Sequence, residues 1–160
     1  MVIRQGRQEE LSELARLYLR AYRGLEEYGE PDLQAAENYL GWLFSTCPEG
    51  FLVVEVGKKP AGFLACCPDW RPGGGRERVL EIHELVVDPD FRGQGLARAL
   101  LERAFELGRA RGRKKACLWV GEGNRQAREL YRRLGFQEQG RWGKWIRMVR
   151  GLPPAPNRLL

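Results

Sequence analysis

The sequence has few of the residues that metal centres and disulfide frameworks require. Its 160 residues include a single histidine, His83, and four cysteines, Cys47, Cys66, Cys67 and Cys117. Structural zinc sites use four Cys or His ligands, typically with C-x-x-C spacing, and that spacing is absent. The cysteine pattern does not resemble a disulfide framework either. We therefore expect no metal, and four thiols buried as small hydrophobic groups in a reducing compartment.

Long hydrophobic runs are also absent. No apolar stretch approaches the ~20 residues that a membrane-spanning helix needs, and residues 1–6 lack the apolar core of a signal peptide. Hydrophobic residues make up 43% and charged residues 30% of the chain, as in ordinary globular domains. We therefore expect one soluble, cytoplasmic domain that binds no membrane.

Charge is distributed unevenly along the chain. The net charge is +6, but residues 24–50 contain six carboxylates and neither Lys nor Arg. The remainder therefore carries +12, which suits nucleic acid or a polyanionic small molecule as a partner. The basic run 109–115 is only weak support for nucleic-acid binding. It crosses a predicted helix end, where cations complement the dipole in any case, and it lacks interleaved aromatic residues.

Hydrophobic periodicity predicts one α/β (α+β) domain with a mixed sheet. Residues 79–120 predict two parallel strands joined by a right-handed crossover through a helix. We place the domain at residues 1–150 and a proline-rich, loosely held C-terminal tail at residues 151–160. Helices are predicted over 9–28, 33–44, 94–111 and 124–134, and strands over 2–4, 51–56, 61–67, 79–87, 116–120, 136–140 and 144–150.

The strongest chemical signal is the turn between the strand at 79–87 and the helix that follows it. It reads DPDFRGQGLA, and the first turn of a helix presents unpaired N–H groups and partial positive charge to an anion. Gly93 and Gly95 would let a phosphate approach the main chain, while Arg92 and Arg98 add full positive charges. This turn therefore predicts a pyrophosphate-binding site.

Two common phosphate-binding patterns do not fit this turn. The P-loop sequence is absent, and a dinucleotide fingerprint would require a small residue in place of Arg98. The remaining pattern, Arg-x-x-Gly-x-Ala at 92–97, resembles the acyl-CoA signature of the GNAT superfamily of N-acyltransferases. Residues 124–136, NRQARELYRRLGF, look like the second conserved block of that superfamily. The resemblance implies a GNAT fold, with a mostly antiparallel sheet flanked by helices.

The resemblance also implies a set of residues that bind acetyl-CoA. The strand backbone at 85–87 would pair with the pantetheine arm where a bulge separates this strand from the next, and the amides at 93–98 would hold the pyrophosphate. Asn124 would contact the pantetheine region and cap its helix at the same time. Arg128 or Arg133 could reach a 3′-phosphate, although solvated surface positions are favoured. The full predicted set is Leu85, Val86, Val87, Arg92, Gly93, Gln94, Gly95, Leu96, Ala97, Arg98, Asn124, Ala127 and Tyr131.

Four residues are candidates for the chemistry. Tyr131 stands where GNAT enzymes place a tyrosine beside the CoA sulfur, and a phenol can support the departing thiolate. An amine must lose a proton before or during attack on a thioester, and Glu81, His83 and Glu84 are candidate bases. Alternation along a strand puts Glu81 and His83 on one face, unless the bulge intervenes. Which of the three, or a water, serves as base is open.

In this superfamily, the acceptor cleft is lined by the first two helices, the loop between strands three and four and the C-terminal strands. In this sequence, the corresponding segments are residues 22–44, 68–78 and 142–145. The acidic segment falls within the first of these, so we hypothesise a cationic acceptor such as a polyamine, an aminoglycoside-like amine or a peptide amine. The predicted activity is transfer of an acetyl group from acetyl-CoA to a primary amine by direct attack in a ternary complex. Two alternatives remain: an acyl-CoA-binding sensor without catalysis, and a basic nucleic-acid-binding module. A homodimer is possible, as in many relatives.

Overall fold

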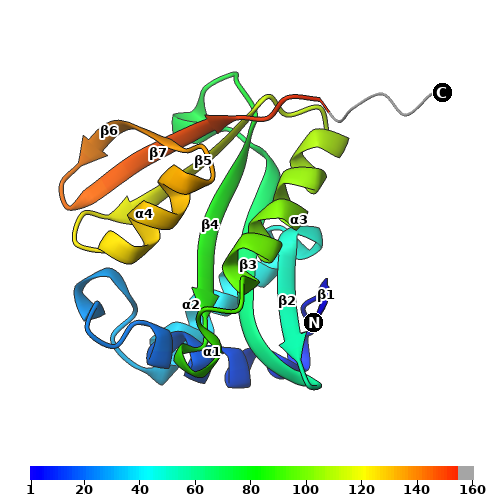
Figure 1. Cartoon of the computed structure of the whole chain (residues 1–160), viewed down its shortest axis with the longest axis vertical. Coiled ribbons are helices and arrows are strands. Elements are labelled where there is room, and N and C mark those ends of the chain that lie inside the picture. Colours follow the sequence, from blue (N-terminus) through cyan, green and yellow to red (C-terminus); the bar gives the residue numbers. More distant parts are fainter. Residues whose placement is uncertain (155–160) are drawn as a thin grey trace.

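Residues 1–154 are described by a computed structural model, and the end of the predicted tail, 155–160, lies outside the described residues. The elements follow the predicted order (Figure 1). The strands are β1 (Val2–Gln5), β2 (Phe51–Val56), β3 (Lys59–Trp70), β4 (Val79–Val87), β5 (Lys115–Gly121), β6 (Gln137–Trp142) and β7 (Trp145–Gly151). The α-helices are α1 (Leu11–Ala21), α2 (Leu33–Thr46), α3 (Leu96–Ala110) and α4 (Arg125–Arg133).

The first helix is shorter than its hydrophobic pattern predicts. It ends at Ala21, because Gly24 takes a left-handed conformation (φ 85°) and turns the chain. Residues 24–31 then form a loop, here called the strap, which contains one short 3-10 turn (Glu26–Tyr28). Strand β3 is longer than predicted, because Pro68 to Trp70 continue it instead of starting a loop.

The seven strands form one sheet in the order β1-β2-β3-β4-β5-β7-β6. Every neighbouring pair is antiparallel except β4 and β5, which are parallel, so the predicted mixed and mostly antiparallel sheet is confirmed. The parallel pairing is brief: it runs only from Leu80 opposite Ala116 to Ile82 opposite Leu118. Beyond that point the two strands diverge, and β5, β6 and β7 fan away from β4 (Figure 1).

Helices cover both faces of the sheet, and each face has its own core. Strand β2 illustrates the alternation: Leu52 and Val54 belong to the core under α3 and α4, whereas Phe51 and Val53 belong to the core under α1 and α2. Both cores contain fully buried leucine and aromatic side chains. The central strands β3 and β4 contribute side chains to both cores. Because the four helices pack on these cores, their positions relative to β4 are fixed.

A bulge in β4 interrupts this alternation. Ala65 of β3 pairs with Glu84, but its neighbour Cys66 pairs with Ile82, so His83 is an extra residue in β4. Ile82 faces the core under α3 before the bulge, and Leu85 packs against that same core after it. His83 and Glu84 therefore both lie toward α1 and α2, together with Glu81. Strict alternation would have put Glu84 on the opposite face.

The prediction of four free thiols is wrong. Cys47, just after α2, forms a disulfide with Cys67 of β3, with their Cα atoms 5.5 Å apart. Their separation of twenty positions does not signal a pair, because it is the return of the chain through β2 and β3 that brings them together. Cys66 and Cys117 are buried free thiols, as predicted.

The start of the predicted tail differs from expectation as well. Gly151 is the last residue of β7, and the side chain of Leu152 is buried in the core beneath α3. The Leu152 N–H donates to the carbonyl of Lys114 at 2.7 Å. The chain is therefore anchored through Leu152, two residues past the predicted boundary.

Candidate active site

The glycine turn before α3 presents a run of free amides. Gly93 (φ 80°) and Gly95 (φ 77°) are both left-handed, and a Cβ added to either would meet nothing within 4 Å. None of the N–H groups from Gly93 to Arg98 donates to a backbone or side-chain acceptor within residues 1–154. Exposed donors at the positive end of a fifteen-residue helix suit a phosphate group. The turn therefore fits the pyrophosphate of CoA.

A cavity of about 470 Å³ begins at this turn and runs between β4 and α4. The predicted cofactor-binding residues converge on it from two stretches of the sequence, 85–98 and 124–127. Gln94 and Tyr131 alone among them do not line it. The predicted residues that do are Leu85, Val86, Val87, Arg92, Gly93, Gly95, Leu96, Ala97, Arg98, Asn124 and Ala127.

The arginines around this cavity differ in how freely they can meet an anion. Arg92 donates to the Ala21 carbonyl at 3.3 Å, and Arg98 pairs with Glu102 on the surface of α3. Arg133 lines the cavity, whereas Arg128 is held away from it by Glu138 and by the carbonyl of Glu122. Of the two candidates for a 3′-phosphate, the geometry therefore favours Arg133.

Asn124 is the N-cap of α4, and its side chain accepts the Ala127 N–H at 3.3 Å. It also lines the main cavity and a second, small cavity of about 40 Å³ at the point where β4 and β5 diverge. Capping and contact with a ligand are therefore compatible for this residue, as the sequence indicated. Leu85 and Tyr22 line both cavities too, so the two spaces adjoin.

Tyr131 faces the small cavity between the diverging strands. Its side chain is buried, and its ring packs against Phe136 with centroids 5.6 Å apart. The hydroxyl makes no hydrogen bond to another described residue. Burial, with a smaller effect of the Glu84 carboxylate, raises the pKa of this phenol above its usual value. Tyr131 is thus both a core residue and a residue that borders the gap between β4 and β5.

A third cavity, of about 360 Å³, lies on the other side of the gap, and we call it the aromatic cavity. Seven tyrosine and tryptophan side chains and two carboxylates dominate its lining. The cavity adjoins the gap, because His83, Glu84 and Trp145 line both spaces. The lining residues are Tyr18, Tyr22, Tyr28, Glu30, Tyr39, His83, Glu84, Trp119, Trp142 and Trp145.

Glu84 lies where the aromatic cavity meets the gap. Its carboxylate accepts hydrogen bonds from Tyr22 at 2.7 Å and from Tyr39 at 3.0 Å. Burial raises the pKa of Glu84 to about 7, although hydrogen bonds from Tyr22, Tyr39 and the Leu85 N–H act in the opposite direction. A carboxylate with a pKa near neutrality is suited to accept and release a proton.

Glu81 and His83 have other contacts and other pKa shifts than Glu84. Glu81 is buried and receives two hydrogen bonds from Arg147, at 2.6 and 2.8 Å, so both of its oxygens are engaged. His83 packs edge-on against Trp42 and Trp70, at 5.8 and 4.6 Å between centroids. Burial and then the Arg147 guanidinium lower the pKa of His83 to about 4, so the imidazole is neutral at physiological pH.

The strap closes the site on its outer side. The Tyr28 hydroxyl accepts the Gly123 N–H at 2.8 Å, and a Cβ on Gly121 would lie 2.5 Å from the Tyr28 ring. Lys144 adds a hydrogen bond to the Glu27 carbonyl and lies 5.5 Å from the centroid of the Tyr28 ring. The glycines after β5 thus allow the strap to dock on the C-terminal half of the domain.

The aromatic cavity involves two of the three segments that the sequence predicts for the acceptor cleft, and contacts that the sequence does not predict. Of the three predicted segments, 22–44 and 142–145 line the aromatic cavity, whereas 68–78 does not. Tyr22 and Tyr39 were recognisable only as members of apolar helix faces, and no pattern links either of them to Glu84. Arg147 likewise lies 66 residues from Glu81. These contacts depend on how the helices and strands pack together.

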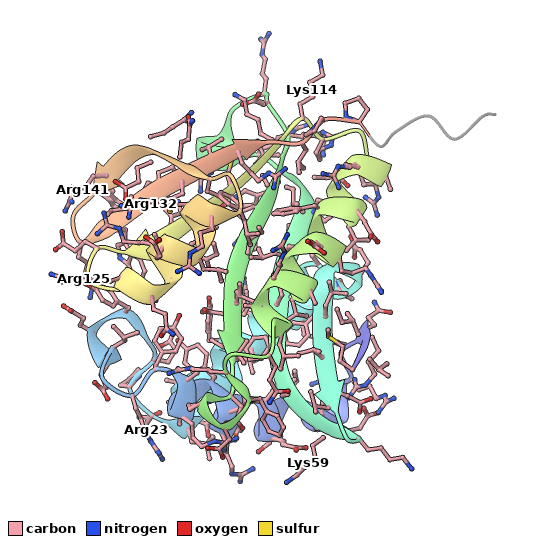
Figure 2. The ribbon with its side chains drawn as sticks, in the orientation of Figure 1. Arg23, Lys59, Lys114, Arg125, Arg132 and Arg141 are labelled. Carbon is pink, nitrogen blue, oxygen red and sulfur yellow. A yellow bond between two sulfur atoms is a disulfide. The ribbon has the colours of Figure 1, made fainter. Side chains whose placement is uncertain are left out.

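The basic residues do not form a single stripe. In Figure 2, Arg23 and Lys59 lie at the lower end of the view and Lys114 at the top, whereas Arg125, Arg132 and Arg141 lie together on the left. Within the basic run 109–115, Arg111 pairs with Asp69 and Glu49, and Lys115 pairs with Glu77. These pairs reduce the positive charge available to a nucleic acid at that end of the domain.

Neither a metal-binding cluster nor a membrane-spanning helix is present in the described residues. In residues 1–154, no cluster of three or more His, Cys, Asp or Glu side chains is arranged to hold a metal ion. No helix in this part of the chain is both long and apolar enough to span a membrane.

The fold and the cavities have the arrangement expected of an acyltransferase: a glycine turn with free amides, a gap between two parallel strands, and an aromatic cavity beyond it. Comparison with known proteins agrees. The sequence model of the Acetyltransferase (GNAT) family matches residues 11–136. The chain belongs to this family, which confirms the resemblance and the predicted enzyme class.

Two curated archaeal relatives are similar over most of this chain. An uncharacterized N-acetyltransferase of Methanocaldococcus jannaschii is 43% identical over 148 residues, which cover 92% of this chain and 66% of the relative. The chain therefore spans about two thirds of that longer protein. An uncharacterized N-acetyltransferase of Archaeoglobus fulgidus is 41% identical over 131 residues, which cover 82% of this chain and 89% of the relative.

Solved structures of other proteins have the same fold. A protein of Pyrococcus horikoshii OT3 is 38% identical and superposes with a TM-score of 0.83, over 94% of this chain and 97% of that one. The PaiA N-acetyltransferase of Thermoplasma acidophilum, solved with coenzyme A, has the same fold at 18% identity, with a TM-score of 0.73 over 94% of this chain and 98% of that one.

Proposed function

We propose that this protein transfers an acetyl group from acetyl-CoA to a primary amine held in the aromatic cavity. The observation that carries the proposal is the adjacency of the three cavities. Tyr22 lines all of them, from the amide turn, through the gap between β4 and β5, to the side of Glu84. A cofactor that starts at the turn can therefore direct its reactive end toward the carboxylate.

The described residues fit acetyl-CoA in distinct ways. The amides from Gly93 to Arg98 would bind the pyrophosphate, and the unpaired edge of β4 at 85–87 would bind the pantetheine arm like an added strand. Bound acetyl-CoA would supply a thioester carbonyl that the amine nitrogen attacks and a thiolate that leaves. A backbone N–H near Val87 would stabilise the negative charge that develops on the carbonyl oxygen.

Glu84 is the residue we assign as the general base. Its pKa of about 7 leaves part of the population ionised at neutral pH, ready to accept the proton of the incoming ammonium group. Glu81 is committed to Arg147, and His83, with a pKa of about 4, is a weak base that packs against Trp42 and Trp70. Of the three candidate bases, this proposal therefore takes Glu84.

Tyr131 is assigned to the departing sulfur. Because burial raises the pKa of its phenol, the hydroxyl holds its proton more tightly than a free tyrosine does. Complete transfer of that proton to a thiolate would be unfavourable. Tyr131 would therefore stabilise the leaving group by donating a hydrogen bond, with water as the final source of the proton.

The acceptor is proposed to be cationic. Of the residues that line the aromatic cavity, Glu30 and Glu84 are the acids and none is Lys or Arg. Aromatic rings attract cations through their faces, and the Glu30 carboxylate and the ionised part of the Glu84 population add negative charge. A polyamine, an aminoglycoside-like amine or a peptide amine would satisfy these features.

The test is a release assay for the CoA thiol over a panel of amines, with wild type beside Glu84→Gln. We expect thiol release that depends on the amine, and a fall in kcat of roughly 10²–10⁴-fold in the variant. Calorimetric titration with CoA should show binding to both proteins. Binding without thiol release for any amine would favour the sensor alternative instead. Displacement of CoA by DNA would favour the nucleic-acid-binding module.

A further inference from the structure

Two hydroxyls from different helices hold the Glu84 carboxylate. Tyr22, directly after α1, donates to Oε2 at 2.7 Å, and Tyr39, in the middle of α2, donates to Oε1 at 3.0 Å. Each oxygen therefore has its own donor before any acceptor amine is bound. Two directional hydrogen bonds to separate oxygens resist rotation of the carboxylate about its terminal bond.

The two tyrosines are themselves held in place. The Tyr18 ring packs against Tyr22 and Tyr39, at 4.6 and 5.8 Å between centroids. The Tyr18 hydroxyl accepts the Glu30 N–H at 3.0 Å, which fixes the strap over this cluster. The backbone at Gly29 lies directly on Tyr22, since a Cβ there would be 2.9 Å from the ring. Neither Tyr22 nor Tyr39 can turn away from Glu84 without displacing neighbours.

We propose that Tyr22 and Tyr39 are positioning residues, which orient the Glu84 carboxylate toward the amine and set the pH at which it gains a proton. The inference rests on the proposed function, in which Glu84 is the base. The family resemblance assigns neither tyrosine a role. Their contribution follows from the two hydrogen bonds and from the packing that holds both donors in place.

The surroundings of Glu84 leave these hydroxyls as its main stabilising contacts. Among the described residues, no cationic side chain faces it. Only the Leu85 N–H assists the two tyrosines in stabilising the anion. The titratable groups are Tyr18 from α1, Tyr22 directly after α1, Glu30 from the strap, Tyr39 from α2, Tyr131 from α4 and His83 from β4.

Loss of either hydroxyl should therefore make the anion harder to form. A hydrogen bond to a charged group contributes more than one between neutral groups, so its removal should raise the pKa of Glu84 by about one pH unit. A phenylalanine keeps the ring and its packing, so Tyr22→Phe and Tyr39→Phe isolate the effect of the hydroxyl. A purely structural role for these residues would leave the titration midpoint unchanged.

The decisive measurement is a ¹³C NMR titration of the Glu84 carboxyl carbon in the free protein, with the resonance assigned by its loss in Glu84→Gln. We expect an upward shift of the midpoint by about one pH unit in each variant. The acidic limb of the kcat/KM profile should move by the same amount, because it reports ionisation in the free enzyme. Unchanged midpoints in both variants would overturn the inference.

Tyr18→Phe is the matched control, because it removes a hydroxyl from the same cluster that donates nothing to Glu84. Its midpoint should stay at the wild-type value, and an equal shift there would mean that the effect is not specific to the two donors. The titration does not depend on activity. If the shifts occur in a protein that acetylates no amine, the proposed function fails while the coupling of the tyrosines to Glu84 stands.

Discussion

Glu81 and Glu84 lie three residues apart in β4 and have different electrostatic surroundings. Arg147 donates to both oxygens of Glu81, so the negative charge has a cationic partner beside it. Glu84 has only hydroxyl and amide donors, and burial there raises the pKa to about 7. The bulge at His83 brings the two acids to one face of the sheet, and their partners then give them different chemistry.

The raised pKa of Glu84 should appear in the stability of the protein. In the unfolded chain this carboxyl titrates near its ordinary value of 4.5, and in the folded protein near 7. Between these values the folded state binds the extra proton, so the free energy of unfolding should fall as pH rises from 4.5 to 7. Above pH 7 the free energy of unfolding should therefore be lower by about 3 kcal/mol because of this carboxyl group.

Urea unfolding of wild type and Glu84→Gln at pH 5 and pH 8 would measure this loss. The variant stays neutral, so it should gain stability relative to wild type by about 3 kcal/mol between the two pH values. All other ionisable groups are common to both proteins and cancel in the comparison. Parallel stability curves for the two proteins would show that burial does not penalise the Glu84 charge.

Helix α2 is the element whose position matters most for this chemistry. It carries Tyr39, which contacts Glu84, and Trp42, which packs against His83. Its C-terminal end is tied to β3 through the disulfide between Cys47 and Cys67. A covalent link at this end limits how far the unfolded chain can spread, and it also ties α2 to the sheet in the folded state.

Removal of the disulfide should destabilise the protein. Closing a loop of twenty residues contributes about 3 kcal/mol in the chain-entropy account, so Cys47→Ser with Cys67→Ser should lower the free energy of unfolding by about that amount. Differential scanning calorimetry with and without dithiothreitol provides the measurement. The Tm of wild type should fall on reduction, whereas the Tm of the double variant should not respond.

A thiol assay on denatured, unreduced protein is the independent check. Two of the four cysteines should react, because Cys66 and Cys117 are free and the other two are bonded. Reaction of all four thiols in protein purified under oxidising conditions would contradict the disulfide. Wild-type stability that does not respond to dithiothreitol would contradict its contribution to the fold.

At the scale of the whole molecule, the parts that could be predicted are those that depend on local sequence. The order of the elements follows from hydrophobic periodicity, and the pyrophosphate turn from Gly93 and Gly95 beside a helix start. The disulfide and the approach of Tyr22 and Tyr39 to Glu84 depend on contacts between distant segments. The register of β3 against β4, which places the bulge at His83, has no local signature either.

Charge is also organised at this scale. The strap and α2 carry the acidic segment, and Glu30 from the strap lines the aromatic cavity, while the phosphate turn lies on the basic remainder of the chain. The two substrates of the proposed reaction would thus meet fields of opposite sign. Because such fields act over about one Debye length, their effect should depend on ionic strength.

Neutralising the strap should weaken binding of a cationic acceptor and leave the cofactor unaffected. For the triple change of Glu26, Glu27 and Glu30 to Gln, we expect the KM of the acceptor to rise roughly three- to tenfold at low salt, with the KM of acetyl-CoA unchanged. The increase should shrink as salt is added, since screening already weakens the wild-type field. Steady-state kinetics at two ionic strengths provides the measurement.

A second triple variant separates the local field from net charge. Changing Glu9, Glu13 and Glu106 to Gln alters the net charge by the same amount, but these side chains are exposed and none of them lines the three cavities. Acceptor KM in this control should match wild type. If both triple variants raise the KM equally, net charge is the cause; if neither does, the acceptor is not selected by its positive charge, and the aromatic lining alone must account for binding.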